Sequence, residues 1–307
     1  RGETSLSYYE FTTLACFIVI QNISPDYVIL EVGLGGRLDA TNIIDPNIAV
    51  ITTIDLDHQA FLGNTREEIG AEKAGILRSE RVAVIGDREI PQSVINIIES
   101  KKVLAECRNQ DFDIELSTTE WCYKNINNAS CFDKLMMPHI PIDNVATAIT
   151  VFNKLGLQLS TPFINEIIKQ TKVPGRMEFI SFKPDVVLDV GHNPQAARYL
   201  ASQLKKGKYN RIFAVVAMLS DKDIKNTLDS MSGTITDWYA AGLDVPRGQN
   251  SENIVNELKS LGHLAIGFDK VSDAYKMAIK NAESTDAVIV FGSFFTVSEI
   301  KALLIQE

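Results

Sequence analysis

Short runs of β-branched and other apolar residues alternate along the first half of the chain with stretches of helical period. The runs occupy residues 27–32 (YVILEV), 48–54 (IAVITTI) and 81–86 (RVAVIG). Continuous apolar runs of this length are typical of strands that are buried on both faces of a parallel sheet. Residues 65–77 are helical in period and open with a Thr followed three residues later by Glu, as in a capping box. Strand, helix and strand in this order predict a right-handed crossover unit.

The pattern changes twice before the middle of the chain. Residues 103–137 carry a weaker, mixed pattern, for which we expect short antiparallel strands. Residues 143–155 return to a helical period. The segment 173–176 (VPGR) then ends the preceding helix, because Pro and Gly together favour a turn. We place a domain boundary here, which divides the chain into residues 1–173 and 174–307.

The alternation of strands and helices resumes after this boundary. We expect strands at residues 186–190, 211–219, 237–242 and 287–291, and helices at residues 195–205, 223–231, 252–261, 272–281 and 297–305. This order predicts a smaller, Rossmann-like α/β domain. The fold class predicted for the whole chain is therefore α/β, with a mostly parallel sheet in a central domain and a second, smaller α/β domain.

The composition is that of an ordinary globular protein, with 307 residues of which 45% are hydrophobic and 22% charged. The net charge of −9 gives no overall positive field that would attract nucleic acid or an anionic membrane. The longest apolar run, residues 14–20, is far shorter than the ~20 residues of a membrane-spanning helix. The four cysteines lack the C-x-x-C spacing, and we interpret them as ordinary core thiols in a reducing cytosol.

Candidate catalytic groups follow two of the predicted strands, where an open parallel sheet binds its ligands. Glu31 ends the first strand and precedes the loop 33–39 (GLGGRLD), whose glycines let the backbone approach a ligand closely. His58 follows the second strand, in a segment (DLDH) that also holds two carboxylates. Carboxylate and imidazole groups bind divalent metals. A tight turn and a structural histidine are the alternatives for these two features.

Three further side chains are candidates for binding. Lys73 lies on the helix that packs beside this rim, where a solvated salt bridge is the alternative. Asp189 ends a strand of the second domain in the segment DVGHNP and suits the hydroxyls of a ribose. Asn193, before Pro194, fits a helix N-cap instead. Arg176 can contact a phosphate through its planar guanidinium or form a salt bridge in the linker.

Five segments together resemble the folylpolyglutamate synthase/dihydrofolate synthase family of the Mur ligase superfamily, and its bacterial bifunctional form in particular. They are residues 28–42 (VILEVGLGGRLDATN), 56–63 (LDHQAFLG), 72–76 (EKAGI), 174–179 (PGRMEF) and 188–197 (LDVGHNPQAA). The resemblance implies a ligase of folate and one-carbon metabolism. Such an enzyme uses ATP to phosphorylate a substrate carboxylate, and the amine of L-glutamate then displaces phosphate to form an amide.

The resemblance also implies the roles of individual residues. Glu31 and His58 match Mg²⁺ ligands, and Lys73 matches the lysine that the family carbamylates, whose anion helps to hold a second Mg²⁺. Asn144, Arg176 and Asp189 match contacts to the adenine, phosphate and ribose of ATP, so the nucleotide is expected between the two domains. The candidates for the pterin of dihydropteroate are Ser7, Tyr8, Tyr9, Asp39 and Ala40. The candidates for the incoming glutamate are His192 and Ser293.

One departure from the family pattern concerns its N-terminal phosphate loop. No G-x-x-x-x-G-K-[ST] motif occurs in the 307 residues, and the chain begins with Arg1 in sequence of helical character. We therefore expect the first domain to be truncated at its N-terminus, the residues as printed to be inactive, and the intact parent protein to be an active ligase.

Three alternatives compete with this function. A nicotinamide-dependent oxidoreductase predicts a G-x-G-x-x-G fingerprint, and neither the loop 33–36 nor the segment 191–193 supplies one. A non-catalytic nucleotide-binding fragment leaves the combination of Glu31, His58 and Lys73 unexplained. A Mur-type ligase for another amino acid also remains open. The sequence predicts a monomeric cytoplasmic enzyme that binds small molecules and neither nucleic acid nor membrane, and it leaves open whether both synthase activities are present.

Overall fold

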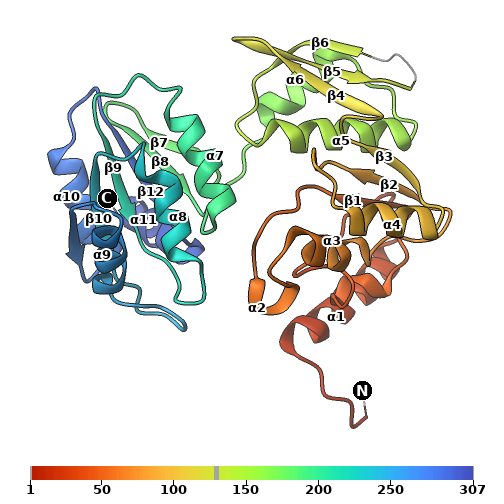
Figure 1. Ribbon diagram of the computed structural model, residues 1–307, viewed down its shortest axis with the longest axis horizontal. Coiled ribbons are helices and arrows are strands. Elements are labelled where there is room, and N and C mark those ends of the chain that lie inside the picture. The colour runs from red at the N-terminus through yellow and green to blue at the C-terminus, as the bar shows by residue number, and fades with distance from the viewer. Residues whose placement is uncertain (1, 128–130, 307) are drawn as a thin grey trace. The chain divides into compact units, whose positions relative to one another are not determined.

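The computed structural model describes residues 2–127 and 131–306 of the chain (Figure 1). Its contacts divide the chain into two compact units, residues 1–137 with 141–165, and residues 138–140 with 166–307. The division falls within helix α6 (Thr161–Gln170). Within the described ranges, no helix is long and apolar enough to cross a membrane.

The first unit contains a three-stranded parallel sheet in the order β1-β2-β3. Its elements are β1 (Ile48–Ile51), α2 (Gln59–Leu62), α3 (Arg66–Ala74), β2 (Val82–Ile85), α4 (Gln92–Ser100) and β3 (Leu104–Cys107). The predicted crossover of strand, helix and strand is confirmed. Thr65 caps α3 in a capping box with Glu68, and the helix buries Ile69 and Ala74 against the sheet.

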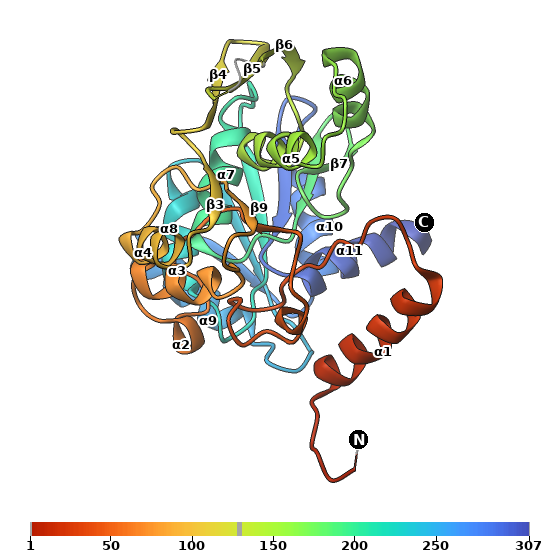
Figure 2. The same ribbon diagram turned by 90° about the vertical axis from the view of Figure 1, so that its right-hand side faces the viewer.

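The strand predicted at residues 27–32 is wrong. These residues form a loop between α1 (Tyr8–Ile23) and the 3₁₀ helix η1 (Ala40–Ile43), as Figures 1 and 2 show. The loop leaves Ile29 94% exposed. Residues 27–32 do not pair with the free edge of β1, the outer strand of its sheet, or with any other described strand, so the run has no partner. A continuous apolar run becomes a buried strand only where such a partner exists.

A small antiparallel sheet completes the first unit, in the order β4-β5-β6. The strands are β4 (Phe112–Leu116), β5 (Glu120–Asn125) and β6 (Cys131–Met136), and they confirm the short antiparallel strands predicted in this region. Residues 104–107 also lie in the region where antiparallel strands were predicted, but they form β3, which pairs in parallel with β2. Helix α5 (Ile142–Lys154), also predicted, contacts the sheet through a buried hydrogen bond of 2.9 Å between the hydroxyls of Tyr123 and Thr150.

The second unit is a six-stranded sheet in the order β11-β10-β9-β12-β8-β7, parallel except for β7. Its strands are β7 (Glu178–Ser181), β8 (Asp185–Asp189), β9 (Ile212–Val216), β10 (Asp237–Ala241), β11 (Ala265–Phe268) and β12 (Ala287–Phe291). Its helices are α7 (Pro194–Leu204), α8 (Ile224–Ser232), α9 (Ser251–Ser260), α10 (Val271–Asn281) and α11 (Phe294–Gln306). The predicted Rossmann-like arrangement is confirmed, and only β7 and β11 were not predicted.

Alternate residues of the central strands of this sheet point into two separate hydrophobic cores. On one face, Val187 and Ile289 pack with side chains of α7, α8 and α9. On the other face, Leu188 and Val290 pack with side chains of α10 and α11. Both faces of the sheet are therefore covered, as in doubly wound α/β folds.

The interpretation of all four cysteines as core thiols is wrong. Cys107 is buried at the end of β3, but Cys122 is half-buried, and Cys16 and Cys131 are exposed. The error arises because the burial of a cysteine depends on which face of its helix or strand it occupies, and composition does not reveal this.

Candidate functional site

The glycine-rich loop, residues 33–39, packs directly against the C-terminal end of α3. The backbone N–H of Arg37 donates to the carbonyl of Glu72 at 2.9 Å, and the Arg37 guanidinium donates to the Glu72 carboxylate. A Cβ atom on Gly36 would lie 2.9 Å from the carbonyl oxygens of both Glu72 and Lys73. Only glycine permits this approach of one backbone to another. The contact fixes the loop beside the helix turn that carries Lys73.

Asp39 holds this loop in shape. Its Oδ2 accepts hydrogen bonds from the backbone N–H groups of Gly33 (2.9 Å) and Leu34 (3.0 Å). Its Oδ1 accepts from the N–H (2.9 Å) and the hydroxyl (2.7 Å) of Thr41. Burial alone would raise the pKa of Asp39, but the hydrogen bonds from Thr41, Leu34 and Gly33 together lower the pKa below its ordinary value. Asp39 is therefore a carboxylate at neutral pH, and it also caps η1 at Ala40.

Tyr9 and Glu31 lie beside this loop. The Tyr9 hydroxyl donates to Oδ1 of Asp39 at 3.5 Å, and a Cβ atom on Gly33 would meet that hydroxyl at 2.9 Å. Burial, followed by the charge of Asp39 and, more weakly, that of Glu31, raises the pKa of Tyr9. Glu31 is therefore close enough to Tyr9 for its charge to act on the hydroxyl. Glu31 is exposed, and the loop rather than a strand end places it.

The structure brings Lys73 close to Asp57. Lys73 lies in the last turn of α3 and is half-buried. Burial lowers the pKa of its ammonium group, and the negative charge of Asp57 partly opposes that shift. Asp57 in turn adjoins His58, whose backbone N–H donates to its Oδ1 at 2.8 Å. The segments that carry Lys73 and His58 are therefore near each other, and their joint role at a metal site stays a prediction.

His58 occupies an unusual backbone position. Its φ of 49° is in the left-handed region, which few residues other than glycine adopt, and it precedes the short helix α2. Its Nε2 lies 3.9 Å from Oδ1 of Asp57, and its side chain is 37% exposed. The imidazole is therefore accessible to a ligand from solvent.

A buried carboxylate that the sequence did not reveal holds the end of β1 in place. Asp87 is 4% exposed, and its Oδ2 accepts from the backbone N–H of Ile54 at 2.6 Å. Arg66 donates to the other oxygen of Asp87 at 2.8 Å and to the carbonyl of Ile54 at 2.9 Å. In the sequence, the only signal of a role for Asp87 is its position directly after the apolar run 81–86. Asp57 was likewise not predicted as a site residue, although it lies in the segment DLDH, directly before His58.

The remaining pterin candidates lie on α1 and η1. Ser7 caps α1 in a capping box with Glu10, and Tyr8 is 86% exposed. Ala40 is the first residue of η1. Of the candidates on α1, Tyr9 is the one with a hydrogen bond to the glycine-rich loop.

A second group of candidates gathers at the carboxyl end of β8. Asp189 is 5% exposed and accepts hydrogen bonds from the backbone N–H groups of Met177 (2.9 Å) and Gly191 (2.7 Å). Burial raises the pKa of Asp189 above its ordinary value, and these hydrogen bonds and the charges of Arg176 and His192 oppose the shift. Asp189, Arg176 and His192 are therefore neighbours. Asn144 is an exposed residue in the first turn of α5, in the other unit.

Two candidates in the second unit serve as helix caps. Asn193 accepts from the backbone N–H of Ala196 at 2.8 Å and precedes Pro194 at the start of α7, as the N-cap interpretation predicts. Ser293, one of the glutamate candidates, is 3% exposed. Its hydroxyl accepts from the backbone N–H of Thr296 at 3.0 Å and contacts the Thr296 hydroxyl at 2.6 Å, at the start of α11.

Comparisons with known proteins identify relatives over most of the chain. Residues 9–158 match the Mur ligase middle domain, and residues 175–294 match the glutamate ligase domain of Mur ligases. The chain is 40% identical, over 99% of its length, to the dihydrofolate synthase/folylpolyglutamate synthase of Escherichia coli K12, of which it covers 71%.

Solved structures agree with this relationship. The structure of E. coli FolC in complex with DHPP and ADP superposes with a TM-score of 0.94 at 38% identity, covering 99% of this chain and 72% of that one. A bifunctional folylpolyglutamate synthase/dihydrofolate synthase from Yersinia pestis, complexed with AMPPNP and Mn ion, gives a TM-score of 0.90 at 39% identity, with coverage of 99% and 72%.

The close approach of Gly36 to α3 can be tested by adding a single methyl group. We expect Gly36→Ala to weaken the docking of the loop, because the new Cβ would meet two backbone oxygens that cannot move independently. Overpacking of this kind costs about 1–3 kcal/mol, so hydrogen exchange of a peptide spanning residues 33–42 should accelerate at least about fivefold.

Gly233→Ala is the matched control, because the atom nearest to its added Cβ is the Lys205 Nζ at 4.0 Å and its φ of −78° suits any residue. Exchange in residues 33–42 that is equally slow in both variants would contradict the docking of the loop on α3.

Proposed function

The chain belongs to the dihydrofolate synthase/folylpolyglutamate synthase family of Mur ligases, and from this premise we propose how its residues support catalysis. It is an ATP-dependent glutamate ligase of folate metabolism, and we infer that it uses a divalent metal because a solved relative binds AMPPNP together with a Mn ion. The observation that carries this function is the agreement with the E. coli relative in both sequence and fold along almost the entire chain. The roles of individual residues below are our proposal.

The reaction joins a carboxyl group to an amine in two steps. A carboxylate oxygen of the folate substrate attacks the γ-phosphorus of ATP, which forms an acyl phosphate and releases ADP. The amine of L-glutamate then attacks the acyl carbon, loses a proton and displaces phosphate. The phosphate carries away one of the two original carboxylate oxygens, and an amide remains. Both steps gather several negatively charged oxygens, so the site must supply positive charge.

The residues around the glycine-rich loop fit a hard divalent cation. Glu31 offers an exposed carboxylate beside the loop, and His58 offers an accessible imidazole on a constrained backbone. Oxygen and nitrogen donors of this kind suit magnesium or manganese. We propose that Glu31 and His58 hold Mg²⁺, which would neutralise charge on the phosphate oxygens. The docking of the loop on α3 supports this assignment, because it fixes the loop next to Lys73.

We propose that Lys73 is carboxylated on Nζ and that it takes part in a second metal site. The neutral amine attacks carbon dioxide and loses a proton, which leaves a carbamate anion. The burial that lowers the pKa of Lys73 favours the neutral, reactive amine. A carbamate beside the carboxylate of Asp57 would be repelled by it, and a cation bound to both groups would remove that repulsion. The proposal also explains why a half-buried amine faces a segment that carries metal ligands.

The nucleotide is assigned to Asn144, Arg176 and Asp189. Arg176 is exposed and can contact phosphate, while hydrogen bonds fix Asp189 at a strand end where its carboxylate can accept from ribose hydroxyls. We assign adenine to Asn144. For the incoming glutamate, His192 is the better supported of the two candidates, because the Ser293 hydroxyl already caps α11.

The pterin of the acceptor is assigned to Asp39, Ala40 and Tyr9, with Ser7 and Tyr8 nearby in sequence. Asp39 accepts four hydrogen bonds from its own loop, so we propose that its main contribution is to shape the wall that the pterin contacts. We further propose that the enzyme works as a monomer in the cytosol and accepts both dihydropteroate and reduced folates.

The acceptor specificity is tested with the polypeptide expressed together with whatever flanking residues its gene encodes. With ATP, Mg²⁺ and L-glutamate, we expect ADP release in equal amounts with amide formation for dihydropteroate and for tetrahydrofolate. If the acceptor carboxylate is labelled with ¹⁸O, one labelled oxygen should appear in the phosphate, because the acyl phosphate transfers it.

Reactions without glutamate and without acceptor are the controls. A labelled amide with unlabelled phosphate would contradict the acyl-phosphate route. Turnover with glutamate replaced by another amino acid, and none with either folate acceptor, would favour a different Mur-type ligase.

The role of Lys73 is tested by removing its amine. We expect Lys73→Ala to lower kcat on the order of 10²-fold or more, because the negative charge that holds the second metal is lost. A short carboxylate such as acetate should restore part of the activity. The intact protein in ¹³CO₂-containing buffer should give a carbamate ¹³C signal that grows as the pH rises, since only the neutral amine reacts.

Lys101→Ala is the matched control, because Lys101 is also half-buried in the first unit and donates to the carbonyl of Leu77 at 2.9 Å. A carbamate signal that persists in Lys73→Ala would show that another amine is modified.

A further inference from the structure

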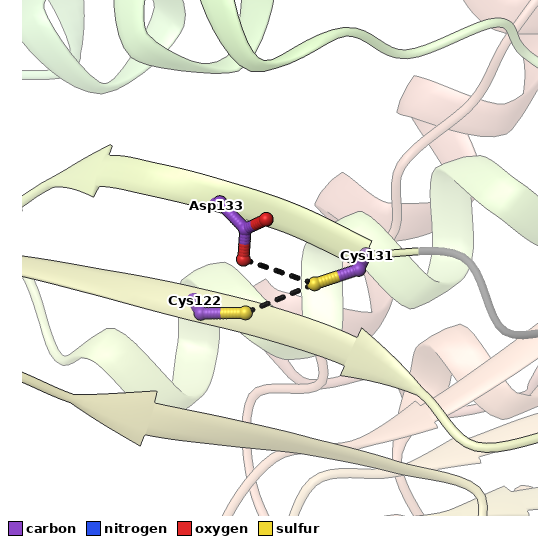
Figure 3. A group of neighbouring side chains, drawn as sticks. All are labelled: Cys122, Cys131 and Asp133. Carbon is purple, nitrogen blue, oxygen red and sulfur yellow. Dashed lines mark hydrogen bonds between the residues drawn. The ribbon is translucent and has the colours of Figure 1, made fainter.

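The outer face of the small antiparallel sheet carries a cluster of groups that glutamate ligation does not use. Cys122 on β5 lies beside Cys131 and Asp133 on β6 (Figure 3). The Sγ atoms of the two cysteines are 3.1 Å apart, and Sγ of Cys131 is 3.2 Å from Oδ1 of Asp133. In the described part of the chain, no other group of three His, Cys, Asp or Glu residues brings its ligand atoms within 4.8 Å of one another.

The cluster lies next to an irregularity in strand pairing. The ladder of β5 and β6 shifts register between Trp121 and Tyr123, so that Cys122 alone faces Asp133 and Lys134. Lys134 has a positive φ of 56°, which a non-glycine residue seldom adopts. A bulge of this kind re-aims the side chains of its strand. Cys131 and Asp133 are two residues apart on β6, so the alternation of the strand places both on the same side of the sheet as Cys122, as Figure 3 shows.

The spacing and the donor types fit a metal ion. Two thiolates bound to one tetrahedral zinc at ~2.3 Å lie ~3.8 Å apart, so the observed pair needs to open only slightly. A disulfide of ~2.05 Å would need the sulfur atoms to approach by about 1 Å and would make no use of the carboxylate. Sulfur ligands select thiophilic ions such as zinc and cadmium over magnesium and calcium.

The surroundings leave the cluster accessible and partly balance its charge. Cys131 and Asp133 are exposed, and a shallow hollow lined by Glu115 and Lys134 adjoins Cys122. Lys124 forms an ion pair with Glu115. This pair is the main cause that raises the pKa of Lys124, and the charges of Cys122 and Cys131 raise it further, so a positive charge lies near both thiols. A cation with two thiolates and one carboxylate carries a net charge of −1, which Lys124 helps to offset.

We propose that Cys122, Cys131 and Asp133 form a binding site for a thiophilic divalent cation, with zinc as the natural candidate and a water molecule as the fourth ligand. Binding releases the two thiol protons to solvent. The ion then joins β6, the outer strand of the sheet, to the central strand β5. The site is separate from the residues proposed for glutamate ligation, and the proposal does not depend on that function.

The test uses the full chain in a reducing buffer with excess Mg²⁺, which keeps hard-metal ligands occupied. Titration with Cd²⁺ should produce a thiolate-to-metal charge-transfer band that saturates at one ion per chain, and Zn²⁺ should displace it. We expect Cys122→Ser and Cys131→Ser to weaken binding at least about tenfold, because even the loss of an outer-shell partner has an effect of this size. Zn²⁺ should also raise the Tm of the unsubstituted chain, since an ion that binds only the folded state stabilises it.

Cys16→Ser is the matched control, because Cys16 is an exposed cysteine outside the cluster. This substitution should leave the charge-transfer band unchanged. Asp133→Asn is a second variant for the case that a cysteine variant folds poorly, because Asp133 is exposed. It should also weaken the binding of Cd²⁺ and Zn²⁺. A missing band, a band that persists in both cysteine variants, or a Cys122–Cys131 disulfide that resists reductant and excludes metal would overturn the proposal.

Discussion

The site in the first unit depends on the close contact between the glycine-rich loop and the end of α3. At Gly36 the two backbones approach so closely that no Cβ fits, and the bond from Arg37 to the Glu72 carbonyl fixes their register. Asp39 rigidifies the other end of the loop through four hydrogen bonds. Because Lys73 lies on the same helix turn, the contact fixes the position of the loop relative to this half-buried amine.

The strands that the sequence predicted well are those buried on both faces of a sheet. In β9 and β12 every position, and in β8 every apolar position, packs into one of two cores, so the apolar run is continuous and predicts a buried strand. β11 was missed because it is an edge strand whose residues are half-buried or exposed. Residues 27–32 show the converse error, since their apolar run indicates a tendency to be buried but cannot identify a partner strand.

The site could be predicted only as far as single residues with distinctive chemistry allowed. His58 and Lys73 stood out by type and position, and the charge of Asp57, the neighbour of His58, acts on Lys73, while their shared role stays a prediction. The bond from Arg66 to Asp87 could not be foreseen, because it joins residues far apart in sequence across a turn of the fold. The association of Cys122 with Cys131 depends on the register of β5 against β6, which a hydrophobic pattern in two short strands does not specify.

The central claim is that this loop and helix together create a site for a hard divalent cation at Glu31 and His58. Anomalous diffraction from crystals grown with Mn²⁺ and a non-hydrolysable ATP analogue tests it most directly. The account predicts a manganese peak coordinated by the Glu31 carboxylate and the His58 imidazole, with Lys73 adjacent. Manganese located elsewhere, with both side chains free of metal, would contradict the account.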